Sequence, residues 1–344
     1  MKHLLLFATL ALPALAFAQG ALTPPGAPAP TMKSLDQIEA RTPIGAVGGS
    51  TATIAITQPG SYVLLGNVTV TGGNAITISA DNVTLDLNGF TLSSTAKPTS
   101  GAGIRTFGTC RGIAIRNGHI SGSILVDESN GSMIGGGFER GIFSGDFLIN
   151  SLVTDLTIDG VSNDGIYLDA SSAIDRCTVI NCGGTGIRGQ VVSNCTATAC
   201  GTTGILATTI SNSQGFAVKT SGIEATTATN CVGAITGLTS GVGLKAGSAA
   251  NCTGTGTNGT GLLAGTATDC TGTSNSGFGL QADTATGCHG ATLGGQRGLY
   301  IIGTATNCRG KNSAANGVAL SAHIAIGCTA ESGSILVNYR YNMP

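Results

Sequence analysis

The chain has 344 residues, of which 55 are glycine and 9 are proline, and charged residues make up only 10% of it. The glycines follow no three-residue period and 41% of the residues are apolar, so the composition excludes both a collagen and a disordered chain. A net charge of −1 leaves no basic excess for binding nucleic acid.

Residues 1–18 have the organisation of a secretion signal peptide. A short basic start precedes an apolar run too short to span a bilayer, and the small-x-small sequence Ala-Phe-Ala ends the segment. We therefore expect a mature chain that begins at Gln19 and is secreted, periplasmic or held at the cell surface. Residues 19–49 predict a Pro/Ala/Gly-rich leader and N-terminal cap, with a short helix over residues 31–41. No later apolar run is long enough to cross a membrane.

Two markers repeat with the same spacing in the second half of the chain. Cysteines recur every 18 to 21 residues, and one double interval of 36 residues holds Ser213 in place of a cysteine. This cysteine column consists of Cys177, Cys195, Cys231, Cys252, Cys270, Cys288, Cys308 and Cys328. A glycine followed by an aliphatic residue recurs with the same spacing, from Gly165-Ile166 to Gly317-Val318. Such repeats, built from short β segments and Gly/Asn turns, predict one solenoid turn each, and their glycine and threonine content argues against helical repeats.

The predicted fold is thus an all-β, right-handed parallel β-helix over residues 50–344, with ten to thirteen coils of 18–24 residues. Two segments before the regular repeats, ADNVTLDLNGFTL (80–92) and CRGIAIRNGHISGS (110–123), each read as strand, Asn-Gly turn and strand. With these phrases the chain resembles the pectin-lyase-like superfamily, in particular secreted bacterial β-helix repeat proteins. The resemblance implies a fold but no single activity, because such folds carry many functions.

The repeating cysteines allow three interpretations. A column of small, buried core residues is favoured, because Ser213 replaces one member without breaking the phase and unpaired cysteine is often buried. The secretory compartment also permits disulfides, for which Cys182 and Cys200 are the best candidate pair. A metal site is disfavoured because a one-dimensional ladder does not form a tetrahedron.

A candidate glycan-binding surface lies in the earlier, more charged coils. The residue directly after each Gly-aliphatic marker is expected to point outward, and in successive turns of this region it is aromatic or basic. Neighbouring loops add charges. Ring faces suit sugar C–H groups and guanidinium groups suit hydroxyls or uronates, although an ordinary solvated surface explains the same residues. The candidates are Arg140, Phe143, Asp164, Tyr167, Asp169 and Arg188.

A second candidate surface consists of paired threonines before the column cysteines. The middle residue of each three-residue segment is apolar and expected to point inward, so its hydroxylated neighbours point outward. Such a grid could match ice or another crystalline surface, but threonine is also simply a favourable residue on an exposed strand. The pairs are Thr266 and Thr268, Thr284 and Thr286, and Thr304 and Thr306.

From these patterns we expect a secreted or surface-exposed scaffold or adhesive protein that contacts extracellular polysaccharide without catalysis. The first alternative, a polysaccharide lyase or glycoside hydrolase, follows from the resemblance, but no catalytic residues can be assigned because no complete signature of such enzymes is present. The second alternative is binding to ice or a crystalline surface. No cofactor is expected, and Ca²⁺ would be implied only for a lyase; the oligomeric state is open.

Overall fold

The computed structural model describes residues 40–146, 148–168 and 171–343. The chain divides into residues 1–40 and a second unit, Arg41–Pro344. The predicted signal peptide, leader and most of the predicted helix over residues 31–41 lie outside the described residues, as does Asp169. The described residues contain β-strands and no helix, so none of them forms an apolar helix of membrane-spanning length.

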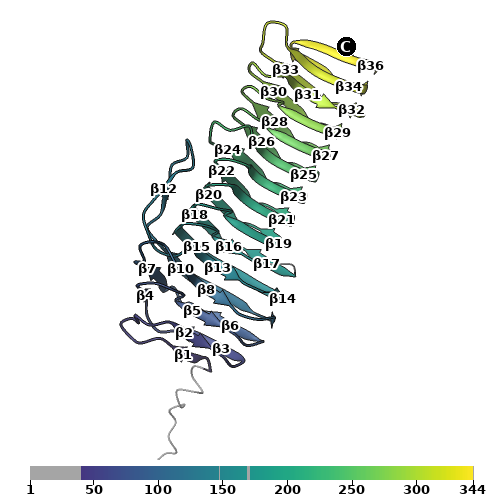
Figure 1. Ribbon diagram of the computed structural model, residues 1–344. Helices are drawn as coiled ribbons and strands as arrows, with labels where there is room; N and C mark the ends of the chain where they lie inside the picture. The colour runs from purple at the N-terminus through teal and green to yellow at the C-terminus, as the bar shows by residue number, and fades with distance from the viewer. Residues whose placement is uncertain (1–39, 147, 169–170, 344) are drawn as a thin grey trace, which may run out of the picture. The chain divides into compact units, whose positions relative to one another are not determined.

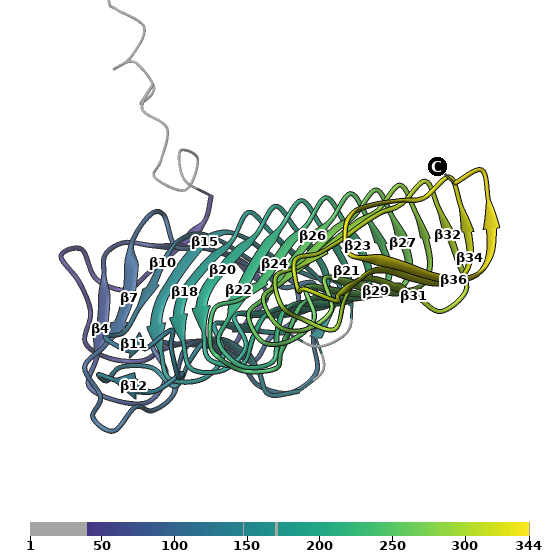
Figure 2. The ribbon, with the colours of Figure 1, turned by 90° about the horizontal axis from the view of Figure 1, so that it is seen from above.

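The strands of Arg41–Pro344 stack in parallel as a β-solenoid of about 14 turns, which confirms the predicted all-β parallel β-helix with slightly more turns than expected. Figure 1 and Figure 2 show strands of successive turns lying side by side along one axis. Each turn contributes strands to three stacks in succession, which we call face A, face B and face C. Many strands run through the bend between faces A and B, so their first half belongs to face A and their second half to face B.

Face A begins with strands that belong to it alone and continues with the first halves of longer strands. Its strands are β2 (Ile54–Ile56), β5 (Ile76–Ile78), β8 (Ala102–Thr106), β13 (Arg140–Ser144), β16 (Ile166–Tyr167), β19 (Ile187–Ser193), β21 (Thr203–Ser211), β23 (Ser221–Thr229), β25 (Val242–Ala250), β27 (Leu262–Thr268), β29 (Leu280–Thr286), β31 (Arg297–Ile301), β34 (Val318–Ile326) and β36 (Ser334–Tyr341).

Face B comprises the second halves of those longer strands and several strands of its own. These are β1 (Thr42–Ile44), β3 (Gly60–Leu64), β6 (Val83–Asp86), the first halves of β10 (Ala114–Ser121) and β15 (Ser151–Val161), β17 (Ser172–Asp175) and β32 (Thr304–Thr306).

Face C contains β4 (Val68–Val70), β7 (Thr91–Ser94), the second halves of β10 and β15, β18 (Thr178–Cys182), β20 (Thr196–Cys200), β22 (Gln214–Ala217), β24 (Val232–Ile235), β26 (Thr253–Gly256), β28 (Thr271–Ser274), β30 (His289–Thr292), β33 (Arg309–Asn312) and β35 (Thr329–Ser332). Two small sheets lie outside the faces. They are β9 (Cys110–Arg111) with β14 (Leu148–Ile149), and the antiparallel hairpin of β11 (Leu125–Val126) and β12 (Met133–Ile134).

The turn between faces B and C is made by residues in the left-handed region of the backbone. Asparagine tolerates this conformation because its short polar side chain can bond locally, and glycine tolerates it because it has no Cβ. The position is held at φ between 49° and 54° by Asn194, Asn212, Asn230, Asn251, Asp269 and Asn307, and at positive φ by Gly287 and Gly327. Successive side chains also bond, since Asn230 Nδ2 donates to Asn212 Oδ1 at 3.1 Å.

The core becomes thinner along the axis. The inward residues of face C fall in size through Ile158, Val179 and Ala197, and six glycines follow in the same register column, from Gly215 to Gly310. In the later turns they oppose the glycines of face A so closely that a Cβ on Gly272 would lie 2.3 Å from the Gly279 carbonyl oxygen. Two backbones therefore meet directly inside the later turns.

Candidate functional site

One outward column runs along face A through the residue that follows each inward aliphatic residue. Backbone register places Phe143 between Arg105 and Tyr167, and Arg188 next to Tyr167. Three side chains far apart in sequence that were predicted to share a surface, Phe143, Tyr167 and Arg188, are therefore immediate neighbours on successive turns. We call this column the outer column of face A.

The aromatic rings and guanidinium groups of this region form one cluster. The ring centroids of Phe143 and Tyr167 lie 5.6 Å apart with a tilt of 57°. The Arg140 guanidinium lies 4.3 Å from the Phe143 centroid, and that of Arg188 lies 4.7 Å from the Tyr167 centroid. Such contacts orient the arginines by the attraction between a cation and the face of a π system.

The charges around the rings are unevenly balanced. Arg140 pairs with Glu139 at 2.8 Å and with Asp164 at 3.5 Å. Asp164 also accepts a hydrogen bond from the Thr185 backbone N–H at 2.9 Å, so its carboxylate holds adjacent turns together and is not a free base. Arg188, in contrast, is exposed and makes no ion pair with any residue that the structure describes. The cluster thus offers partly accessible aromatic rings and a cationic group to a ligand.

Sequence reasoning missed two members of this cluster. The Arg105 guanidinium lies 5.3 Å from the Phe143 centroid and 4.6 Å from that of Phe107. Arg105 follows Gly103-Ile104, which is the same Gly-aliphatic marker that identifies the later turns. The insertion that contains the β11–β12 hairpin separates this turn from the next and hides the regular spacing.

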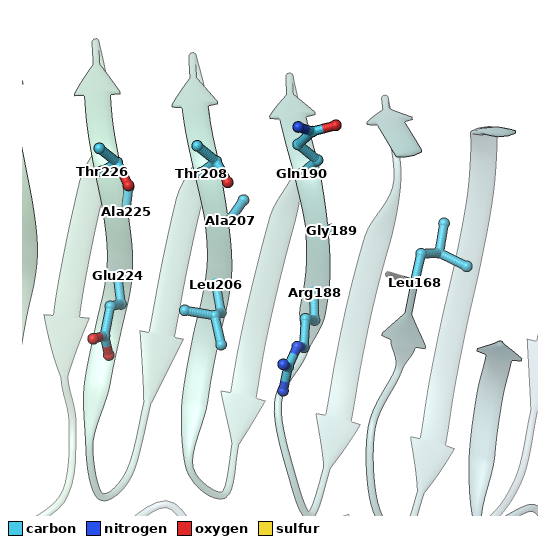
Figure 3. Close-up of a pocket in the computed structure, with 10 residues that line it drawn as sticks. All are labelled: Leu168, Arg188, Gly189, Gln190, Leu206, Ala207, Thr208, Glu224, Ala225 and Thr226. Atoms are coloured by element: carbon cyan, nitrogen blue, oxygen red, sulfur yellow. The ribbon is translucent and has the colours of Figure 1, made fainter. Parts of the chain in front are cut away.

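A groove of about 440 Å³ continues the cluster across β19, β21 and β23 (Figure 3). Its floor at the bend between faces A and B holds small residues in register, Gly189, Ala207 and Ala225. Among the described lining residues Glu224 is the only carboxylate, and its Oε1 atom pairs with Lys245 Nζ at 2.8 Å. The described part of the groove therefore does not hold the two carboxyl groups that glycoside hydrolysis ordinarily uses.

The threonine pairs form in-register rungs on face B. Thr266 pairs with Thr284, Thr268 with Thr286, and Thr286 with Thr306. The side chains on β27 and β29 are exposed and those on β32 are half-buried. Ile324 and Ile326 follow Thr304 and Thr306 in the next turn, so the hydroxylated grid ends at β32.

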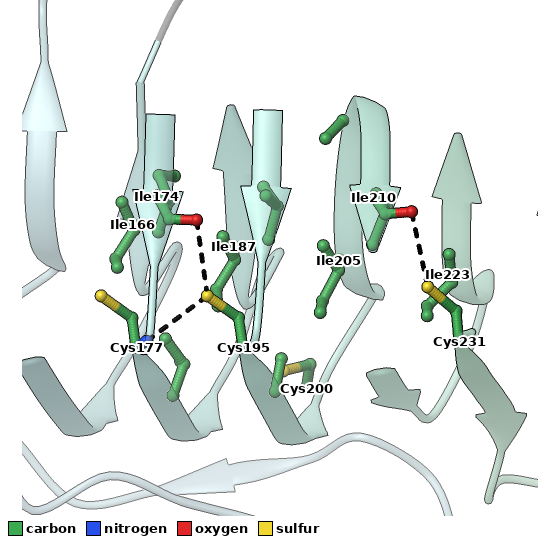
Figure 4. Close-up of a cluster of buried hydrophobic side chains, with 14 of the residues drawn as sticks. Ile166, Ile174, Cys177, Ile187, Cys195, Cys200, Ile205, Ile210, Ile223 and Cys231 are labelled. Atoms are coloured by element: carbon green, nitrogen blue, oxygen red, sulfur yellow. Dashed lines mark hydrogen bonds between the residues drawn. The ribbon is translucent and has the colours of Figure 1, made fainter. Parts of the chain in front are cut away.

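All 11 cysteines are buried, and all are free thiols. Figure 4 shows the column cysteines projecting into the core beside Ile174 and Ile210. Cys182 and Cys200 are register partners on β18 and β20, as their spacing suggested, but no disulfide joins them in the structure. Within the described residues, no group of three or more His, Cys, Asp or Glu side chains is placed to hold a metal ion.

Comparison with known proteins gives one weak structural similarity. No protein-family model and no curated protein matches the chain. The chain is similar to a solved structure described as the catalytic domain of Agl-KA, with 13% sequence identity and a TM-score of 0.33. The alignment covers 88% of this chain and 60% of that one, so this chain spans less than two thirds of the length of its structural neighbour.

Proposed function

We propose that the protein is a secreted or surface-exposed β-helix scaffold that binds extracellular polysaccharide on face A without catalysis. The observation that carries the proposal is the Phe143–Tyr167 ring pair with the Arg140 and Arg188 guanidinium groups beside it. These rings lie in an outward column, where the core does not require aromatic residues. Half-buried rings with oriented hydrogen-bond donors beside them are suited to a flat, hydroxylated or acidic sugar.

Binding without hydrolysis agrees with the charges of the groove. Glu224, the carboxylate among the described lining residues, is held by Lys245, and Asp164 is engaged by Arg140 and Thr185. The alternative, a carbohydrate-active enzyme, is tested by incubating the purified protein with polygalacturonate or a neutral glucan. Release of new reducing ends or unsaturated products would show that the protein is such an enzyme and would contradict the scaffold proposal.

The proposal is tested by affinity electrophoresis in gels that contain polygalacturonate or a neutral glucan. Tyr167→Ala should weaken binding to the retained polymer by about 1 kcal/mol or more, about fivefold in Kd, because one ring face is lost. Tyr341→Ala, which removes an exposed tyrosine in the register column of face B, is the matched control and should leave retention unchanged. Equal retention of both variants and the parent protein would rule the cluster out.

The second candidate function is binding to ice or a crystalline surface through face B. The in-register pairs of β27, β29 and β32 favour it, because parallel strands repeat the hydroxyl rungs about every 4.8 Å with about 7 Å between the two hydroxyls of a rung. Thermal hysteresis and inhibition of ice recrystallisation measure it. Activity that Thr286→Lys abolishes would support this function, and no activity at high protein concentration would end it.

A further inference from the structure

The tetrapeptide Arg-Gly-aliphatic-aromatic occurs twice on face A. It is Arg140-Gly141-Ile142-Phe143 at the start of β13 and Arg297-Gly298-Leu299-Tyr300 in β31. In both copies the arginine lies over the ring three residues later, at 4.3 Å from the Phe143 centroid and 4.5 Å from the Tyr300 centroid. The same local sequence thus builds the same cation–ring contact at two places.

A second ring from an adjacent turn completes each copy. Tyr167 lies 5.6 Å from Phe143, and Phe278 lies 5.3 Å from Tyr300 with the two rings nearly parallel at 20°. All four rings are half-buried, so part of each ring remains accessible to solvent. Arg297 makes no ion pair with a described residue, so this second cluster is cationic as well.

The ring of each tetrapeptide, Phe143 or Tyr300, lies on the outer column of face A. Eight register steps lead from Phe143 to Tyr300 through Tyr167, Arg188, Leu206, Glu224, Lys245, Leu263 and Gln281. At about 4.8 Å per turn the two aromatic residues are about 38 Å apart. The surface between them is hollowed by the groove at Arg188–Thr226 and by a shallower depression beside Lys245 and Leu263.

We propose that Phe278, Arg297 and Tyr300 form a second glycan subsite, and that one extended acidic polysaccharide chain runs along face A and binds both clusters. The inference rests on the proposed function at Phe143 and Tyr167. Ring faces take the apolar faces of the sugars, and the guanidinium groups of Arg188 and Arg297 bind carboxylate or sulfate groups of the same chain. A chain that reaches both subsites gains affinity because its second contact is intramolecular.

Isothermal titration with size-fractionated polygalacturonate tests the proposal on the full chain. Short oligomers should bind with a stoichiometry of two per protein, and chains that span about 38 Å should bind with a stoichiometry of one and a Kd at least about tenfold lower. Tyr300→Ala should remove one of the two short-oligomer sites and abolish the gain with chain length. Tyr341→Ala is again the matched control, and circular dichroism verifies that each variant is folded.

Two results would overturn the second subsite while the proposed function stands. The first is that short oligomers bind with a stoichiometry of one, and that Tyr167→Ala abolishes this binding while Tyr300→Ala leaves it intact. The second is an equal Kd for short and long chains. The absence of binding to any polygalacturonate fraction by the parent protein overturns the inference of an acidic chain, and the proposed function itself is contradicted if the gels with a neutral glucan show no retention either. The pair of ring variants therefore separates the failure of the inference from the failure of the function on which it rests.

Discussion

At the scale of single residues, one local hydrogen bond explains which residue types occupy the cysteine column. The thiols of Cys231, Cys252 and Cys270 each donate to the carbonyl oxygen two residues earlier, at 3.1 to 3.2 Å. Ser213 makes the same bond at 2.7 Å through its hydroxyl, which explains why serine replaces cysteine without breaking the repeat. The position requires a small residue that donates a hydrogen bond locally, because the turn leaves little room for a larger side chain.

Substitutions at Cys270 should follow this requirement. Cys270→Ser keeps the bond to the Thr268 carbonyl and should lower the free energy of unfolding by about 1 kcal/mol or less. Cys270→Ala loses the donor and leaves a small void, so it should cost more, about 1–3 kcal/mol. Cys270→Arg should prevent the turn from stacking. Urea unfolding of the serine and alanine variants measures the difference, and an alanine variant as stable as the serine variant would contradict the role of the bond.

Thiol reactivity tests whether the cysteines are free and buried. Burial, followed by the hydrogen bond with Cys200, raises the pKa of the Cys182 thiol well above 9.0. Because all 11 thiols are buried, a thiol reagent at neutral pH should label none of them in the folded protein and all of them after unfolding without reductant. An unfolded, unreduced sample with fewer reactive thiols would reveal disulfides such as Cys182–Cys200.

The same pKa shift predicts how stability depends on pH. Because the pKa of Cys182 is higher in the folded than in the unfolded chain, the unfolded chain loses its proton first as the pH rises. The stabilisation is complete below about pH 9 and decreases above it. Urea unfolding at pH 8 and pH 10 should show this decrease, and Cys182→Ala should show a smaller one. Equal pH dependence in both proteins would contradict this assignment.

At the scale of the strand, glycine is the residue that sets the thickness of the solenoid. The side chains of Val179 and Ala197 still separate faces A and C in the earlier turns, whereas Gly215 and its five successors let the two backbones touch. The signal was present in the sequence, because a glycine follows Cys231, Cys252, Cys270, Cys288 and Cys308 at the second position. Much of the high glycine content therefore serves close approach of two sheets.

Adding one methyl group at this contact should be costly. In Gly272→Ala the new Cβ would lie 2.3 Å from the Gly279 carbonyl oxygen, so two backbone segments would have to move apart. Overpacking of this kind costs about 1–3 kcal/mol or more. Thr273→Ala, an outward position on the same strand, is the control and should change the free energy of unfolding by less than about 1 kcal/mol. Equal urea midpoints for the two variants would contradict the direct backbone contact.

At the scale of the whole molecule, the periodicity of the sequence was sufficient to predict the fold and part of the candidate site. Because register is constant, residues such as Phe143 and Tyr167 that share a position in the repeat become neighbours in space. Arg105 was not predicted as a member of the site because an insertion interrupts the spacing. The pairing of Phe278 with Tyr300 was not predicted because the two rings occupy different positions of the repeat. The thinning of the core depends on which columns oppose each other, which spacing along the chain does not specify.

The last described strand, β36, carries a charged residue in a column that is inward in the preceding turns. Arg340 is in register with Ala325, in the column of face B whose preceding members point inward. Its Nη2 atom donates a hydrogen bond to the Ile335 carbonyl at 3.0 Å, across the end of the turn. Leu336, Tyr339 and Tyr341 are exposed on the same strand, which pairs only with β34 among the described residues. An inward charge at an edge strand opposes pairing with another strand, because a further turn would bury it.

Removing this charge should promote association between molecules. Arg340→Val leaves an apolar inward column and an edge whose backbone groups are free to pair, so the variant should form larger species than the parent protein at equal concentration. Arg340→Lys keeps a charge at the position and should behave as the parent does. Size-exclusion chromatography with light scattering measures the mass of each protein over a concentration series. A valine variant with the mass of the parent at every concentration would show that Arg340 does not protect the edge. A lysine variant that associates as strongly as the valine variant would show that the bond to Ile335, rather than the charge, protects this edge.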